Sequence, residues 1–146
     1  MVKILVKKFD KKIKLPTYKT SGSSGMDLMA YIKKKINIMP GKFAIIPTGI
    51  ALAIPKNYEI QIRPRSGLAI KKGISVLNTP GTVDSDYRGE IKIILINLSK
   101  KSFVVKSGDR IAQMILCPVA KSKLKVVKNL PKTIRGKGGF GSTDKK

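Results

Sequence analysis

Apolar residues recur at every second position along much of this chain, and this period of two constrains the fold more than any other feature of the sequence. Tyr58, Ile60 and Ile62 alternate with polar residues, and residues 91–98 form a nearly continuous apolar run rich in β-branched side chains. Alternation is typical of strands, and a continuous β-branched run is typical of a buried strand. The same criteria predict further strands at residues 2–6, 26–30, 43–54, 103–105, 111–119 and 124–127.

Turn-forming residues separate these segments at short intervals. Only residues 67–72 offer a helical turn or two, and no segment of ten residues has a helical period. Many short strands between proline- and glycine-containing turns predict an all-β sandwich, jelly roll or barrel. The length of 146 residues fits one such domain. We expect a single β domain at residues 1–134 and a flexible glycine-rich arm at residues 135–146.

The composition excludes several kinds of chemistry. The chain has no histidine and one cysteine, so Cys-His and Ser-His dyads, His-ligated zinc and internal disulfides are ruled out. Any hydrolysis would depend on carboxylates, hydroxyls, backbone donors and an oxygen-bound metal. Cys117 lies in an apolar run and is predicted to be a small buried hydrophobe. Without an apolar run of about 18 residues or a secretory signal, we expect a cytoplasmic protein with no membrane association.

The formal net charge of +23 admits two interpretations. The basic residues could neutralise nucleic-acid phosphates, or they could form a generally solvated surface. Lysines are spread along the chain, aromatic residues make up 5%, and tryptophan is absent, so a base-stacking platform is poorly supplied. We favour a solvated surface that attracts polyanions, and expect no specific nucleic-acid partner.

Arginines and acids are the rarer charges. Five arginines stand among 31 basic residues, against eight acids. Lysine is the default surface residue here, so positions that hold an arginine or an acid are expected to need a specific geometry. Arginine's planar fork binds carboxylate or phosphate in a bidentate way that lysine cannot reproduce.

Two early segments combine glycine with such residues. In residues 24–30, Gly25 precedes Asp27 at the start of a predicted strand, a pattern that by itself favours a structural turn. In residues 63–69, a strand ends at proline, and a Ser-Gly pair opens the helical turn, where exposed backbone N–H groups suit an anion. Arg65 and Ser66 could add contacts to that anion. An N-cap serine beside a surface arginine also fits the pattern.

Residues 78–90 carry the strongest signal. If this segment is an extended strand, Asp84 and Asp86 share one face. The turn before them and Gly89 after them indicate a hairpin. Two acids in one short strand of an acid-poor chain indicate a general base or a metal site. A hairpin stabilised by Asp–Arg pairing is the alternative, and one of the two acids is expected to be structural.

Two late segments complete the set. In residues 108–114, Asp109 and Arg110 could form an ion pair at a turn, and Gln113 lies in an apolar strand where its amide needs a partner in the protein or on a ligand. Residues 135–144 hold four glycines and no core pattern, so alone they should be mobile. Phe140, flanked by glycines, is typical of a loop that closes on a flat ligand.

In this order, the segments SGMDLMA, PRSGLA, NTPGTVDSDYRGE, GDRIAQ and RGKGGFGST resemble the five motifs of the trimeric dUTPase family. The resemblance implies an all-β, jelly-roll-like barrel or sandwich of the dUTPase-like β-clip type. It also implies a homotrimer with active sites shared between subunits. The implied activity is the Mg2+-dependent hydrolysis of dUTP to dUMP and pyrophosphate, which limits uracil in DNA and supplies dUMP for thymidylate synthesis.

The resemblance also implies roles by position. Asp84 corresponds to the carboxylate that activates the water attacking the α-phosphorus, and Asp27 to an acid that contacts magnesium through water. The residues that correspond to uracil and deoxyribose contacts are Asn78, Val83 and Tyr87. Those that correspond to phosphate contacts are Arg65, Ser66, Gly67 and Gln113. The lid that closes over the site corresponds to Arg135, Phe140, Gly141, Ser142 and Thr143, with Phe140 stacked on uracil.

Two alternatives stay open from the sequence. A dCTP deaminase of the related fold would need a proton-shuttling glutamate beside the base, and generally lacks the Phe-containing tail motif. A non-enzymatic nucleic-acid-binding protein would use the basic surface alone. The acids of residues 78–90 argue against the second alternative, because they repel phosphate unless a metal intervenes.

Overall fold

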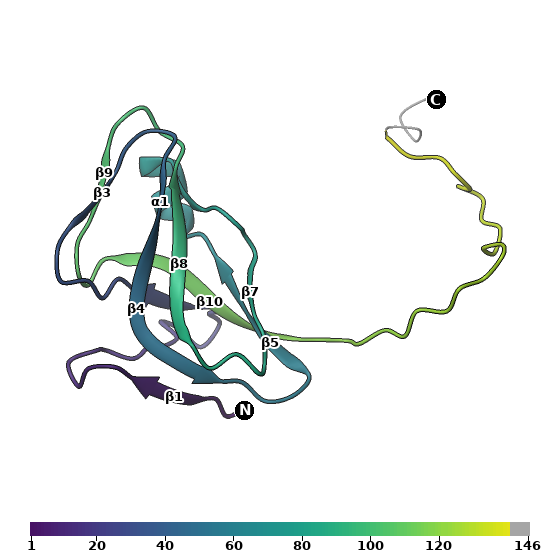
Figure 1. Ribbon diagram of the computed structural model, residues 1–146, viewed down its shortest axis with the longest axis horizontal. Coiled ribbons are helices and arrows are strands. Elements are labelled where there is room, and N and C mark those ends of the chain that lie inside the picture. Colours follow the sequence, from purple (N-terminus) through teal and green to yellow (C-terminus); the bar gives the residue numbers. More distant parts are fainter. Residues whose placement is uncertain (141–146) are drawn as a thin grey trace.

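The computed structural model describes residues 1–140, which form ten strands and one short helix (Figure 1). The elements, in chain order, are β1 (Leu5–Lys8), β2 (Met26–Met29), β3 (Ile36–Ile38), β4 (Phe43–Ala53), β5 (Tyr58–Arg63), α1 (Ser66–Lys72), β6 (Ile74–Val76), β7 (Gly81–Val83), β8 (Glu90–Asn97), β9 (Phe103–Val105) and β10 (Arg110–Pro118). The helix has seven residues, and no helix of the described part is long and apolar enough to cross a membrane.

Two four-stranded antiparallel sheets pack face to face around one core. The first sheet has the order β1-β4-β8-β6 and the second β2-β10-β5-β7, while β3 and β9 form a separate pair. Inward side chains such as Ile46 and Leu95 of the first sheet and Leu28 and Ile60 of the second are fully buried. The prediction of an all-β sandwich or jelly-roll-like fold is confirmed.

Sequence periodicity placed the long strands well and some short ones badly. The predicted strand at residues 124–127 is wrong, because this stretch pairs with no other strand of the described chain. The strands β3 and β6 were not predicted, because three residues give only a weak period, although the equally short β9 was predicted at residues 103–105. Cys117 is half-buried on β10 rather than buried, because its side chain points to the outer face of the sheet.

The hairpin predicted within residues 78–90 does not form. The strand β7 pairs with β5 in the second sheet, whereas β8 pairs with β4 and β6 in the first. Residues 84–89 therefore cross from one sheet to the other. Asp84 follows the last residue of β7, and Ser85 and Asp86 form a turn, so the two acids do not share the face of a strand.

The helix α1 lies directly after β5 and confirms the helical turn predicted near residues 67–72. Its N-cap is Arg65, which makes no side-chain cap hydrogen bond, and Ser66 is the first helical residue rather than the cap. The helix ends at Gly73, whose φ of 63° is left-handed, and the Gly73 N–H donates to backbone carbonyls of the last turn.

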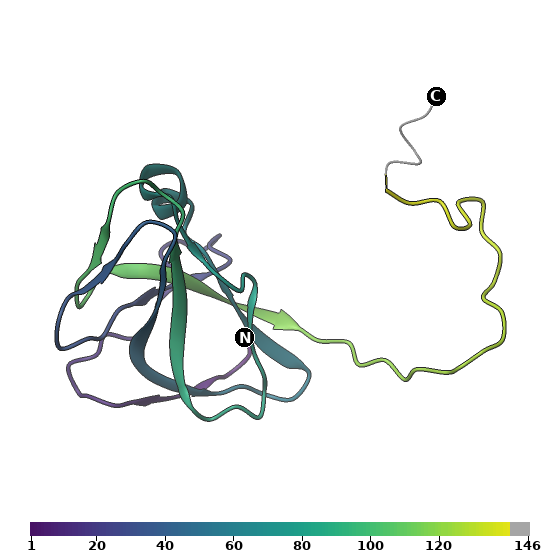
Figure 2. The ribbon, with the colours of Figure 1, turned by 45° about the horizontal axis from the view of Figure 1, so that its top comes forward.

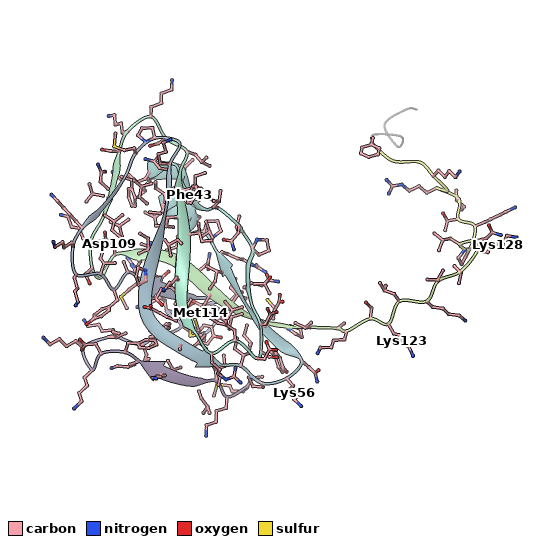
Figure 3. The ribbon with its side chains drawn as sticks, in the orientation of Figure 1. Phe43, Lys56, Asp109, Met114, Lys123 and Lys128 are labelled. Carbon is pink, nitrogen blue, oxygen red and sulfur yellow. The ribbon has the colours of Figure 1, made fainter. Side chains whose placement is uncertain are left out.

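After β10 the chain leaves the body of the molecule (Figures 1 and 2). Residues 120–137 are exposed and form no strand or helix, and Lys123 and Lys128 lie along this stretch (Figure 3). Apolar side chains there are bare to solvent, including Leu124 at 92% and Val126 at 98% exposure. These side chains bury no apolar area against the β domain, so they are available to contact a neighbouring molecule.

Candidate nucleotide site

Three predicted motifs meet on the outer face of the second sheet. Strand register sets Gln113 of β10 between Asp27 of β2 and Arg63 of β5, so the three side chains form a row across the strands. Directly opposed residues of antiparallel strands have Cβ atoms about 4.5–5.5 Å apart. The end of β5 also leads into α1, which brings Arg65 to the same region.

Asp27 is the centre of an ion-pair cluster on this face. Arg65 Nε donates to Asp27 Oδ1 at 2.8 Å, and Arg110 Nη1 donates to Asp27 Oδ2 at 3.3 Å. Arg65 also donates through Nη1 to the Arg110 carbonyl at 3.2 Å. Two guanidinium groups thus share one carboxylate, which leaves a net positive charge and fits an anionic ligand.

The ion pair considered for Asp109 and Arg110 is not present. Arg110 turns to Asp27 on the neighbouring strand, while Asp109 Oδ2 accepts the Lys106 N–H at 2.8 Å and closes the turn before β10. Sequence neighbours point to opposite sides of a strand, so an adjacent pair is poorly placed to form a contact once the strand begins.

Gln113 has a partner in the protein, and its amide oxygen lies close to Gly25. Its Nε2 donates to the Pro64 carbonyl at 3.0 Å, which ties β10 to the segment leading into α1. Its Oε1 lies over Gly25, where an added Cβ would come within 2.7 Å of it. A side chain at position 25 would therefore displace the amide oxygen of Gln113. Ser66 and Gly67 lie exposed at the start of α1.

A second group of predicted residues surrounds the turn after β7. Asp84 is exposed at the rim of a recess that Val83, Tyr87 and Glu90 also line. The Tyr87 N–H donates to the Asp84 carbonyl at 3.2 Å, and the Tyr87 hydroxyl donates to the Glu90 carbonyl at 3.2 Å. The tyrosine ring lies against Gly89, where any Cβ would collide with it.

Arg88 holds this turn and was missed as a site residue. Its Nη1 donates to the carbonyls of Ser85 at 2.7 Å and Tyr87 at 2.8 Å. No ion pair joins it to Asp84 or Asp86 within residues 1–140, so the alternative of an Asp–Arg hairpin is wrong. Because carbonyl oxygens rather than acids satisfy Arg88, the Asp84 carboxylate stays free to act on a ligand.

The structure also describes Asn78, Arg135 and Phe140 among the predicted site residues. Asn78 is exposed and folds over Gly81, where a Cβ would lie 3.1 Å from the Asn78 amide nitrogen. Arg135 donates through Nε to the Gly138 carbonyl at 2.8 Å, and Phe140 is fully exposed. Gly141, Ser142 and Thr143 lie outside the described residues.

The two groups lie at opposite ends of the second sheet. Val83 pairs with Ile60, so Asp84 is level with Glu59, six residues before Arg65. At a rise of about 3.3 Å per residue, roughly 20 Å separates Asp84 from Arg65. In Figure 3, Asp109, which precedes β10, and Lys56, which precedes β5, lie on opposite sides of the body. One chain therefore does not bring Asp84 and the arginine cluster to one ligand.

Residues 1–140 hold no group of three acids, cysteines or histidines that could form a complete metal cage. Magnesium does not need such a cage, because it retains several waters and usually binds one or two carboxylates together with substrate phosphates. The available donors, namely the shared carboxylate of Asp27 and the exposed carboxylate of Asp84, fit an ion carried mainly by phosphates and water.

Comparison with known proteins identifies the family. The family described as dUTPase matches residues 11–144, which is nearly the whole chain. The chain belongs to the dUTPase family. A protein named deoxyuridine 5'-triphosphate nucleotidohydrolase from Hydrogenobaculum sp. is 53% identical over 145 residues, covering 99% of this chain and all of the relative. One of the same name from Rickettsia canadensis is 57% identical over 129 residues, covering 88% and 87% of the two chains.

Solved structures of the family share the fold. A mutant dUTPase of Staphylococcus bacteriophage 80alpha with dUpNHpp has a TM-score of 0.86 at 23% identity, over 97% of this chain and 98% of the other. A mutant dUTPase from phage phi11 of S. aureus, solved to reveal the coordination of a structural Mg(II) ion, has a TM-score of 0.79 at 20% identity, over 89% and 99% of the two chains.

Proposed function

We propose that this chain hydrolyses dUTP to dUMP and pyrophosphate, with Asp84 as the general base. The observation that carries the proposal is the exposed Asp84 carboxylate, held on a clamped turn beside Tyr87 and free of any cationic partner in the described chain. A base in this setting can take a proton from water as the water attacks the α-phosphorus, which typically contributes about 10²–10⁴ in rate. Membership of the dUTPase family supports the same reaction.

The base and sugar of the nucleotide fit the recess beside Asp84. Val83 offers backbone donors and acceptors at the end of β7, and Asn78 lies against the start of the same strand. We assign uracil to these groups. Tyr87 is fixed by its hydroxyl contact to Glu90. We assign its ring as the wall beside the deoxyribose that excludes a 2′-hydroxyl.

The phosphates fit the cationic face around Asp27, Arg65 and Arg110, called the arginine face. Arg65, Ser66, Gly67 and Gln113 supply charged, hydroxyl, backbone and amide contacts there, and positioned donors of this kind stabilise the charge that develops in phosphoryl transfer. Mg2+ bound to the triphosphate, near Asp27 through water, would neutralise negative charge and orient the phosphates. Asp27 keeps Arg65 and Arg110 in place in either case.

A complete site requires a second subunit, because Asp84 and Arg65 lie roughly 20 Å apart in one chain. The outer face of the first sheet offers a surface for assembly. Phe43 and Ile45 are 61% and 56% exposed, and they stand opposite Ile96 and Ile94 on the neighbouring strand. A contiguous apolar face of this kind marks an interface. We assign a homotrimer with sites shared between subunits, in which the segment from residue 135 closes over a site as a lid.

A substrate panel tests the activity. Pyrophosphate release is measured with dUTP, UTP, dTTP and dCTP, with and without magnesium, together with ammonia release from dCTP. Release of pyrophosphate from dUTP alone, dependent on magnesium, is expected. Ammonia from dCTP would favour the related deaminase. Steeply salt-dependent DNA binding without dUTP hydrolysis would favour the nucleic-acid binder. The cytoplasmic location stays a prediction from the sequence.

A further inference from the structure

Arg63 stands beside the proposed phosphate contacts, although no motif reading assigned it a role. It lies directly opposite Gln113 on the neighbouring strand, on the same outer face as Asp27. With Arg65 and Arg110 it places three of the five arginines of the chain on this face. Lysine is the default cation of this surface, so a third arginine here points to a need for the guanidinium fork.

A ladder of hydrogen bonds along β5 fixes the Arg63 side chain. Gln61 Nε2 donates to Glu59 Oε1 at 2.7 Å, which orients the Gln61 amide. Gln61 Oε1 then accepts from Arg63 Nε at 3.1 Å and from Arg63 Nη2 at 2.6 Å. These three residues alternate along the strand, so their side chains lie on the same face.

The ladder leaves one end of the guanidinium free. Within residues 1–140, no acid pairs with Arg63, and its Nη1 makes no hydrogen bond. A long side chain that is already ordered loses little conformational entropy when it binds a ligand. The surrounding chemistry is cationic, because Arg65 and Arg110 share the single carboxylate of Asp27.

We propose that Arg63 is a further phosphate-binding residue, positioned by Gln61 and Glu59, which contacts the phosphate chain of the substrate next to Gln113. This inference rests on the proposed function, because it takes the row Asp27–Gln113–Arg63 as the phosphate face. It adds a group to the contacts made by Arg65, Ser66, Gly67 and Gln113. It also gives Glu59 and Gln61 the role of positioning residues that touch no ligand.

The test compares binding of dUpNHpp, pyrophosphate and deoxyuridine to the full-length protein by calorimetry, together with the steady-state kinetics of dUTP hydrolysis. Arg63→Gln should weaken dUpNHpp binding about 10-fold, as expected for the loss of one charge-assisted hydrogen bond. Pyrophosphate binding should weaken in parallel, while deoxyuridine binding, which involves no phosphate, should not change. The KM for dUTP should rise more than kcat falls.

Three further variants sharpen the result. Lys3→Gln removes the same charge from an exposed position before β1, on the other sheet, and should leave the binding of all three ligands unchanged. Arg63→Lys keeps the charge without the fork and should recover only part of the affinity. Gln61→Leu should weaken dUpNHpp binding by a smaller factor than Arg63→Gln, because the guanidinium remains but is no longer held.

Equal weakening of deoxyuridine and dUpNHpp by Arg63→Gln would overturn the inference, since it would indicate a structural role. Wild-type affinity for dUpNHpp in Arg63→Gln would overturn it as well, and so would a larger effect at Gln61 than at Arg63. These outcomes are distinct from failure of the proposed function, in which the wild-type protein itself would not hydrolyse dUTP.

Discussion

At the scale of single residues, the site depends on close contacts that only particular side chains allow. Gly25 illustrates this, because a Cβ there would come within 2.7 Å of Gln113 Oε1 and within 3.0 Å of Ile115 Cγ1. Gln113 in turn donates to the Pro64 carbonyl and ties β10 to the segment between β5 and α1. A methyl group at position 25 would push this amide away from both its partner and the ligand.

The variant Gly25→Ala is therefore expected to raise the KM for dUTP by about 3- to 10-fold, the range that follows from losing one ordinary hydrogen bond. Gly22→Ala is the matched control, because an added Cβ at Gly22 meets no atom within 4 Å. Steady-state kinetics on both variants check this expectation. Equal KM values in the two variants would show that Gln113 does not need the space above Gly25.

The hydrogen bond from the Tyr31 hydroxyl to Asp10 makes the stability of the fold depend on pH. The hydrogen bond from Tyr31, followed by that from the Lys12 N–H, lowers the pKa of Asp10 below its ordinary 3.8. The same bond to Asp10, together with burial, raises the pKa of Tyr31 above its ordinary 10.0. The Asp10 contribution to stability is present above pH 3.8 and is lost as pH falls through the lowered pKa. The Tyr31 contribution is present below pH 10.0 and is lost as pH rises through the raised pKa.

We therefore expect Tyr31→Phe to lower the thermal unfolding midpoint most at neutral pH, with a difference from wild type that shrinks toward both extremes. Thermal unfolding followed by circular dichroism from acid to alkaline pH provides the measurement. A difference that stays constant across that range would mean that the hydroxyl contributes through packing rather than through the Asp10 hydrogen bond.

At the scale of elements, residues 120–140 lie apart from the β domain that carries the rest of the site (Figure 1). Phe140 and the residues before it contact nothing in the β domain, so removing residues 135–146 should not change the unfolding midpoint. Turnover should suffer, because stacking of a base on an aromatic ring contributes about 1–3 kcal/mol. We expect kcat/KM for dUTP to fall at least about fivefold in Phe140→Ala and further in the truncated chain.

Kinetics of the truncated chain beside Phe140→Ala measure this effect, and the unfolding midpoint serves as the control for folding. Unchanged kcat/KM after truncation would contradict the assignment of a lid. A lower midpoint would instead show that the segment packs on the body in solution.

Strand length and the presence of a partner strand decide which elements could be predicted from the sequence. The strands β4, β5, β8 and β10 could be predicted because each has enough residues to display alternation or a continuous apolar run. Residues 124–127 alternate equally well but have no partner strand, and alternation alone does not provide one. Asp84 and Tyr87 were found through motif resemblance. Arg63 was not, because its position opposite Gln113 depends on a register between strands 50 residues apart.

At the scale of the whole molecule, the site is divided between the two ends of one sheet. Asp84 lies level with the start of β5, and the arginine face lies beyond its end. We propose that a second copy of the chain joins the two on one triphosphate, with the exposed apolar face around Phe43 and Ile45 as the surface for that association. A closed symmetric assembly then creates equivalent sites between neighbouring subunits.

Mixing two inactive variants tests this division. Asp84→Asn and Arg65→Ala should each be nearly inactive alone. Co-refolding the two variants in equal amounts should restore activity at about a quarter of the sites, because random assembly pairs an intact Asp84 with an intact Arg65 at that frequency. Activity of the refolded mixture beside each variant refolded alone is the measurement. A mixture no more active than its parents would place both residues in a site built from one chain.

The most direct measurement concerns the Asp84 carboxylate itself. Asp84→Asn keeps the size of the side chain and removes its ability to take a proton. Binding of dUpNHpp should therefore remain within a few-fold of wild type, while the single-turnover rate of dUTP hydrolysis should fall by at least about 100-fold. Asp86→Asn, two residues away in the same turn, is the matched control and should lose far less activity. Near-normal turnover in Asp84→Asn would contradict the assignment of this carboxylate as the general base.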